Sequence, residues 1–160
     1  MTSGRRGSVT DMAAISDELI ERRLDVVRTH MASENEHDFE TTMATFAHPR
    51  YELIPTGQVF DGEDEVRAYF AGSRATFGDQ RNEPIAMHAT DTGVFAEFWL
   101  LGTHTGRLLG HDPTGREIRV RMVAFFEFAP ADGDHPDGIV CERVYYDLHS
   151  ILTQLGLSGS

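Results

Sequence analysis

The chain has 160 residues, the length of one domain with a single hydrophobic core. Apolar residues make up 40% and charged residues 25%, which is typical of a soluble folded protein and too hydrophobic for a disordered one. The 26 acidic residues outnumber the 14 basic ones and give a net charge of −12. Such a charge disfavours binding to nucleic acid or to anionic membrane surfaces, because both attract basic proteins.

Cysteine usage and hydropathy indicate the compartment. The single cysteine, Cys141, excludes an internal disulfide and a zinc site built on cysteines, which fits a reducing compartment. No apolar run follows Arg5 and Arg6, and no stretch approaches the roughly 18 apolar residues of a membrane span. We therefore expect a soluble, cytoplasmic protein that does not bind a membrane.

The first half of the chain has the periodicity of helices. Residues 1–9 are small, polar and rich in glycine, so we expect a disordered tail there. From Thr10, the expected N-cap, apolar residues recur every three or four positions up to Met31, which predicts an amphipathic helix. Residues 38–46 and the segment that begins at Asp61 predict two further helices.

Strands dominate the second half. Residues 51–55 and 58–60 predict two short strands joined by a turn at Thr56 and Gly57. After the third helix the hydrophobic period falls from about 3.6 residues to about two, which predicts a sheet. The longer strands are expected at 83–90, 94–105, 116–129 and 139–146. A short helix is expected at 147–155.

This order of elements predicts the fold class. Helices followed by consecutive strands are typical of an α+β fold, here a cone-shaped α+β barrel in which a curved, mixed or antiparallel sheet wraps around three N-terminal helices. The helices cannot fill the open end of such a cone, so we expect a cavity for a small molecule there. We assign residues 10–157 to this single domain, including the short C-terminal helix, and residues 158–160 to a second tail.

Three local motifs carry a resemblance to a known family. They are Gly-Thr-His-Thr-Gly at 102–106, Asp-Pro-Thr-Gly-Arg at 112–116, and Tyr-Asp at 146–147 leading into Gln-Leu-Gly at 154–156. In this order they resemble the SnoaL-like polyketide cyclases, or ester cyclases, of the nuclear transport factor 2-like superfamily. The resemblance extends from about residue 15 to residue 157. It implies a cone-shaped cavity, commonly a homodimer, and no metal or organic cofactor.

Asp147 is the leading catalytic candidate. In cyclases of this branch an aspartate at the start of the final helix acts as acid/base in an aldol ring closure, and Asp147 holds that position by resemblance. Its neighbours Tyr145, Tyr146 and Leu148 suit a desolvated carboxyl, whose pKa would rise toward the working pH. The alternative is that Asp147 only caps the helix, a common role of aspartate.

His30 and Tyr146 are expected auxiliaries of Asp147. His30 occupies the position in the first helix where the ketosteroid isomerases of the same superfamily keep an oxyanion-stabilising tyrosine, so it could donate or relay a proton. Alternatively, His30 is a hydrogen-bonded histidine at the edge of the core. The isomerases' proton-abstracting aspartate stands just before a Pro-x-Gly, and this chain has Ile54 there. Ile54 therefore argues against the isomerase mechanism.

Five further side chains are candidates for contact with the substrate: Ile54, Phe70, Trp99, His104 and Arg121. Trp99 is either a cavity wall or a dimer contact. Arg121 either lines the cavity or lies on the solvated side of the sheet, which is the usual position. His104 stands at a strand end, where a surface position is the more common outcome.

The predicted function is that of a small-molecule cyclase or lyase, or an isomerase, that needs no cofactor. Its substrate is expected to be hydrophobic, carbonyl-containing and polyketide-like. The alternatives are a protein of the same fold that binds a small molecule without converting it, and a plain dimerisation scaffold. The acidic loop at 130–138 is expected to be solvated, and no metal site is predicted.

Overall fold

Helix α1 (Asp17–Glu36) begins where Ser16 accepts a hydrogen bond from a backbone amide of the first turn, so its N-cap is Ser16. The expected start at Thr10 is therefore wrong. The structure is a computed structural model that describes residues 14–159. Thr10 and the expected tail at 1–9 lie outside this range.

The other expected elements are all present, with their ends shifted by a few residues. The helices are α2 (Phe39–Ala44), α3 (Glu63–Thr76) and α4 (Leu148–Gln154). The strands are β1 (Arg50–Leu53), β2 (Gln58–Asp61), β3 (Arg81–Ala89), β4 (Gly93–Thr103), β5 (Glu117–Phe128) and β6 (Ile139–Tyr145). None of the helices in the described part of the chain is long and apolar enough to cross a membrane.

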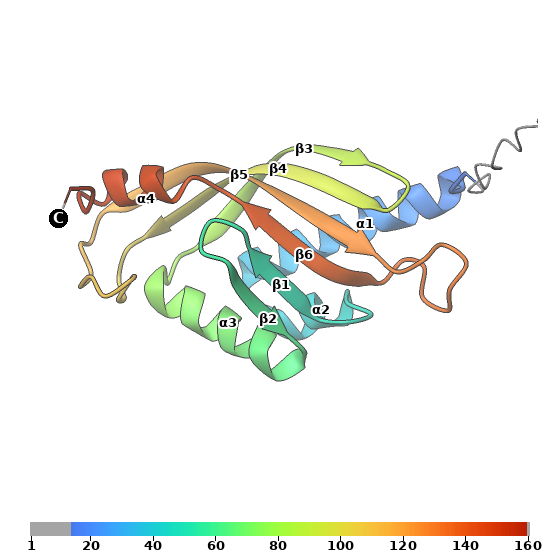
Figure 1. Ribbon diagram of the computed structural model, residues 1–160, viewed down its shortest axis with the longest axis horizontal. Helices are drawn as coiled ribbons and strands as arrows, with labels where there is room; N and C mark the ends of the chain where they lie inside the picture. Colours follow the sequence, from blue (N-terminus) through green and yellow to red (C-terminus); the bar gives the residue numbers. More distant parts are fainter. Residues whose placement is uncertain (1–13, 160) are drawn as a thin grey trace, which may run out of the picture.

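The strands form one six-stranded sheet in the order β2-β1-β6-β5-β4-β3. Neighbours are antiparallel except β1 and β6, which run parallel and place Tyr51 opposite Glu142. The turn between β1 and β2 uses Gly57 at a φ of 69°, a conformation that glycine adopts without strain. The sheet is curved and not closed, with α1, α2 and α3 on one side and α4 at one end (Figure 1). The predicted α+β class is confirmed.

The alternation of side chains along β5 separates the two faces of the sheet. Ile118, Val120 and Met122 are buried against the helices, whereas Arg119 and Arg121 between them are exposed. Hydrophobic side chains that alternate with polar ones are typical of an antiparallel sheet with one covered face and one solvated face. The inner face therefore carries the core.

The core joins the helices to this inner face. Val27 of α1, Val66 of α3 and Phe126 of β5 are each completely buried within one hydrophobic cluster. Burying such a side chain stabilises the fold by about 1.5–3 kcal/mol relative to leaving it in water. The packed core does not fill all of the space between the helices and the sheet, and a cavity remains there.

Candidate functional site

A cavity of about 400 Å³ lies between the inner face of the sheet and the helices α1, α3 and α4. Most of its walls are apolar, from residues that include Phe60, Phe98, Leu100, Met122, Val144 and Ile151. A cavity of this size and character fits a small organic molecule. The predicted cavity is confirmed, and its lining also includes polar and charged residues.

Three of the polar lining residues, Glu34, Tyr51 and Glu142, surround His30, which is completely buried and not part of the lining. We call these four residues the buried acid cluster. The Nε2 atom of His30 lies 3.0 Å from Oε2 of Glu142 and 3.6 Å from Oε1 of Glu34. The hydroxyl of Tyr51 lies 2.9 Å from the same Nε2 and 2.9 Å from Oε1 of Glu34. His30 and Glu142 are 0% and 4% exposed. Charged groups so deeply buried are rare unless they are paired, as these are.

The hydrogen-bond directions indicate that His30 carries two protons. The Thr45 hydroxyl donates to the carbonyl of Thr42 at 2.6 Å, so it accepts from Nδ1 of His30 at 2.8 Å. The Tyr51 hydroxyl donates to Glu34, so Nε2 also acts as a donor, toward Tyr51, while the charge of the ring pairs with Glu142. An imidazole that donates from both nitrogens is an imidazolium.

The pKa of each member follows from burial and neighbouring charge. Burial alone lowers the pKa of His30, but the carboxylates of Glu34 and Glu142 outweigh it and raise that pKa to about 9. Burial raises the pKa of Glu142, the nearby Glu34 carboxylate raises it further, and His30 only partly offsets both. Burial also acts to raise the pKa of Glu34, but the charges of His30 and Arg74 lower it overall. Of the two carboxyls, Glu142 is thus the one whose pKa is shifted toward neutral pH, whereas that of Glu34 is shifted away from it.

Tyr51 and Tyr69 add phenol groups to the cavity wall. Burial, together with the charge of Glu142, raises the pKa of both phenols above their ordinary value, so both stay protonated at neutral pH. Tyr51 uses its proton on Glu34. The Tyr69 hydroxyl makes no hydrogen bond to any residue among 14–159, so it remains available to a ligand.

Local structure explains how the cluster is assembled. His30 and Glu34 lie four residues apart on α1 and therefore on one face of the helix. Glu142 and Val144 lie two residues apart on β6 and share its inward face, and the pairing of β1 with β6 brings Tyr51 beside Glu142. Sequence reasoning named His30 but missed Glu34, Tyr51 and Glu142 as site residues. Spacing on the helix and alternation on the strand were the signals for both glutamates.

Asp147 has the opposite environment. It is the N-cap of α4, where it accepts hydrogen bonds from the amide of His149 at 3.0 Å and from the hydroxyl of Ser150 at 2.6 Å. The hydrogen bond from Ser150 is the main cause of a lowered pKa for this carboxyl, which is exposed and does not line the cavity. The expectation that Asp147 is shielded inside the cavity is therefore wrong, because α4 presents its first turn to solvent.

Of the other candidates, Tyr146 does line the cavity. Phe70 is buried in the core, where its ring stacks against Phe39, and it is not part of the cavity wall. Ile54 is 44% exposed in the turn after β1 and also lies outside the cavity. The expectation that Phe70 and Ile54 contact the substrate is thus not met by their positions.

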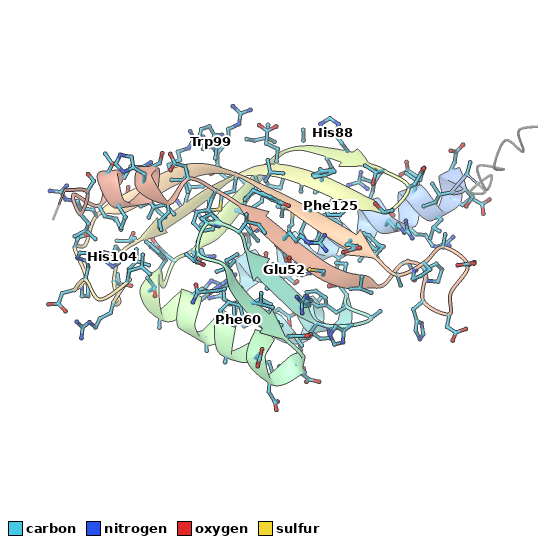
Figure 2. The ribbon with its side chains drawn as sticks, viewed as in Figure 1. Glu52, Phe60, His88, Trp99, His104 and Phe125 are labelled. Carbon is cyan, nitrogen blue, oxygen red and sulfur yellow. The ribbon has the colours of Figure 1, made fainter. Side chains whose placement is uncertain are left out.

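Trp99 and Arg121 lie on the outer face of the sheet. Trp99 projects from β4 away from the helices (Figure 2), and the guanidinium of Arg119 stacks over its ring at 3.9 Å. Arg121 is exposed and pairs with Glu97 on the same face. Neither side chain reaches the cavity, so the solvated alternative holds for Arg121 and the cavity-wall alternative fails for Trp99.

His104 is completely buried, so the expected surface position is wrong. Its Nδ1 accepts a hydrogen bond from the amide of Thr114 at 3.2 Å, and its ring packs against Phe77. Phe77 lines the cavity and separates His104 from it. His104 therefore fixes the Gly-Thr-His-Thr-Gly segment to the following loop instead of contacting a ligand.

The buried acid cluster also contains the one group of residues, within 14–159, whose ligand atoms lie close enough to share a metal ion. The atoms of His30, Glu34 and Glu142 all lie within 4.8 Å of one another. A metal ligand must offer a lone pair, so a metal ion would first have to displace the proton on Nε2 of His30. The arrangement suits proton transfer better than metal binding.

Fold and site together define a class of proteins: α+β folds of the nuclear transport factor 2-like superfamily, with a cavity between a curved sheet and its helices. A family model described as the SnoaL-like domain matches residues 27–134, and the chain belongs to this SnoaL-like family.

Solved structures support the fold. A candidate SnoaL-like polyketide cyclase from Jannaschia sp. CCS1 is 17% identical, over 91% of this chain and 98% of its own, with a TM-score of 0.77. A candidate polyketide cyclase from Xanthomonas campestris pv. campestris is 21% identical, over 86% and 98%, with a TM-score of 0.74. IdmH, a candidate polyketide cyclase from Streptomyces antibioticus, is 22% identical, over 84% and 98%, with a TM-score of 0.69. No curated protein matches the chain.

Proposed function

We propose that this protein is a cyclase or isomerase that needs no cofactor and moves a proton at a carbon next to a carbonyl group, with Glu142 as the acid/base. The observation that carries the proposal is the state of Glu142, a buried carboxyl on the cavity wall with a raised pKa. Its Oε2 lies 3.0 Å from Nε2 of His30 but makes no well-aligned hydrogen bond to any of the described residues. A general base needs a pKa raised toward the working pH and an oxygen that can take up a proton.

The proposed step begins with an ionised Glu142. The carboxylate takes a proton from the carbon, the C–H bond breaks, and its electron pair moves onto the carbonyl oxygen to give an enolate. The enolate carbon then attacks a second carbonyl of the same molecule; the new C–C bond closes a ring, the C=O π bond opens to an alkoxide, and the alkoxide takes the proton back from Glu142. In an isomerisation, Glu142 returns the proton to another atom of the enolate instead. The imidazolium of His30 stabilises the ionised form of Glu142 between steps, which limits how far its pKa rises.

The enolate oxygen needs a hydrogen-bond donor inside the cavity. We propose the phenol of Tyr69, which lines the cavity and keeps its proton at neutral pH. A fixed donor in a site that excludes water stabilises a developing negative charge more than water does. Tyr146 lines the same cavity and is proposed to contact the substrate.

The proposed substrate is a hydrophobic, carbonyl-containing molecule of the polyketide type. The apolar walls and the cavity volume of about 400 Å³ support this class, as do the names of structural neighbours described as candidate polyketide cyclases. Asp147, the acid/base that the family resemblance implied, is replaced in this proposal because it is exposed and caps α4.

Deuterium exchange tests the proposal with simple ketones in place of the natural substrate. Bicyclic aromatic ketones, beginning with 2-tetralone, are incubated in D₂O with the protein, and loss of the proton next to the carbonyl is followed by NMR. We expect the wild type to accelerate exchange over buffer, and Glu142→Gln to lose about 10²–10⁴-fold of that acceleration. A wild type that binds these ketones but accelerates exchange of none would favour the binding-protein alternative and overturn the proposal.

A further inference from the structure

Arg74 stands out among the charged residues of the cavity. It lies in the last turn of α3, partly buried, with its guanidinium stacked over Phe39 at 5.0 Å and Phe70 at 5.8 Å. Its Nη1 donates to the hydroxyl of Ser73 at 2.8 Å, whereas its buried Nε has no hydrogen-bond partner. The group is thus held in place by two rings and still has an unused donor.

No carboxylate of residues 14–159 forms an ion pair with Arg74. Its Nη2 donates to the backbone carbonyl of Glu34 at 3.5 Å, and its charge acts on the Glu34 carboxylate without an ion pair between them. The Glu34 carboxylate is already occupied by Tyr51 and His30. The other two arginines of the cavity are different, because Arg81 pairs with Asp79 and Arg107 with Asp112 at the exposed rim.

Asn82 supplies a second unpartnered group on the same wall. It is 7% exposed at the start of β3, and its Nδ2 donates to the carbonyl of Met31 at 3.2 Å. Its Oδ1 is buried without a hydrogen bond, although the residue lines the cavity. The side chain of Asn35 hydrogen-bonds both the N–H and the C=O of Asn82, and Arg74 hydrogen-bonds the carbonyl of Glu34. Because Glu34 and Asn35 are successive residues of α1, Arg74 and Asn82 lie close to the same part of that helix. Buried polar groups without partners are costly, so two of them at one cavity wall point to a ligand that satisfies them.

We infer that Arg74 and Asn82 form an anchor for an acidic ligand, whose carboxylate binds Arg74 and whose hydroxyl donates to Asn82 Oδ1. A guanidinium fixed on two rings matches the planar, two-oxygen geometry of a carboxylate. The natural substrate is then a free acid of the aromatic, polyketide type and not its ester. This inference deepens the proposed function, on which it rests for the identity of the site, but binding alone tests it.

The probe is 6-hydroxy-2-naphthoate, compared with its methyl ester, and the dissociation constants are measured by fluorescence titration at pH 7. We expect the wild type to bind the acid at least about tenfold more tightly than the ester, because a hydrogen-bonded charge pair discriminates to that extent. Arg74→Gln removes this preference, and Arg74→Lys, which keeps the charge, retains part of it. Arg67→Gln is the matched control, since Arg67 lies on the same helix but is paired with Glu40 at the surface.

Three outcomes overturn the inference: no binding of the acid to the wild type, equal affinity for acid and ester, or a preference for the acid that persists in Arg74→Gln. Thermal unfolding of each variant confirms that the fold is intact. Glu142→Gln separates this inference from the proposed function, because it abolishes exchange but keeps the preference for the acid. If Glu142→Gln exchanged protons normally, the proposed function would fail while the anchor stood.

Discussion

Two carboxyl groups five positions apart in the sequence have opposite environments. Glu142 faces inward from β6, is buried beside the imidazolium of His30, and lines the cavity. Asp147 begins α4, is exposed, and accepts hydrogen bonds from the first turn of that helix. Between them the chain leaves the sheet, so the inward orientation that β6 gives Glu142 does not extend to Asp147. The comparison teaches that the place of an acid in the fold decides whether it can exchange protons with a ligand.

The pKa values follow the same division. Burial and the charge of Glu34 raise the pKa of Glu142, whereas hydrogen bonds, mainly from Ser150, lower the pKa of Asp147. A carboxyl with a lowered pKa is a weak base at neutral pH. The two carboxyls therefore differ in chemistry as well as in access to the cavity.

The largest effect on stability is expected from a substitution of His30, the cation of the buried acid cluster. His30→Gln leaves two carboxyls without their buried cation, and removal of one partner from a buried ion pair typically costs about 3 kcal/mol or more. Urea unfolding monitored by circular dichroism measures the change. His88→Gln, at an exposed position of β3, is the control and should change stability by less than about 0.5 kcal/mol. Equal losses in the two variants would contradict the account.

A smaller effect is expected from pH. The pKa of His30 rises on folding from an ordinary value of 6.5 to about 9, so the folded state binds this proton more tightly than the unfolded state does. Its contribution to stability is fully present below pH 6.5 and is lost as the pH rises through about 9. The raised pKa of Glu142 acts in the same direction.

Unfolding free energies measured between pH 6 and pH 10 test this prediction. The wild type should lose stability across this range, and Asp147→Asn should lose it in parallel, because Asp147 titrates at acid pH. A flat profile for the wild type would show that the buried cluster is not charged as described.

The smallest effect on stability is expected from substitutions of the exposed Asp147. Asp147→Ala removes the two hydrogen bonds that cap α4, a short helix at the end of the domain. Loss of a cap should lower Tm by only a few degrees. Differential scanning calorimetry measures the shift, with Asp147→Asn as the milder variant because its amide oxygen can still accept from the backbone. A loss of Tm as large as that of His30→Gln would remove the distinction between the two regions.

Periodicity predicted the fold because each element has its own hydrophobic signal. The stripe up to Met31 and the alternation along residues 116–129 located α1 and β5, and the order of helices and strands predicted the curved α+β sheet. The start of α1 was less predictable, because both Thr10 and Ser16 are good N-cap residues and local sequence does not choose between them.

The site was only partly predictable. His30 was named because its position on the first helix matched a functional position of related isomerases, and the structure places it in the buried acid cluster. Glu142 was missed because alternation along β6 indicates only that it faces inward, whereas its cluster is assembled by the parallel pairing of β1 with β6, a long-range contact. Asp147 was favoured because its sequence position matched the cyclases, and sequence position says nothing of exposure.

The most direct test of the central claim is the rate of deuterium exchange with 2-tetralone by Glu142→Gln and Asp147→Asn, measured side by side with the wild type. The account predicts that Glu142→Gln loses the acceleration almost completely and that Asp147→Asn keeps a rate within about twofold of the wild type. The reverse result, a silent Asp147→Asn and an active Glu142→Gln, would contradict the assignment of the acid/base to the buried cluster.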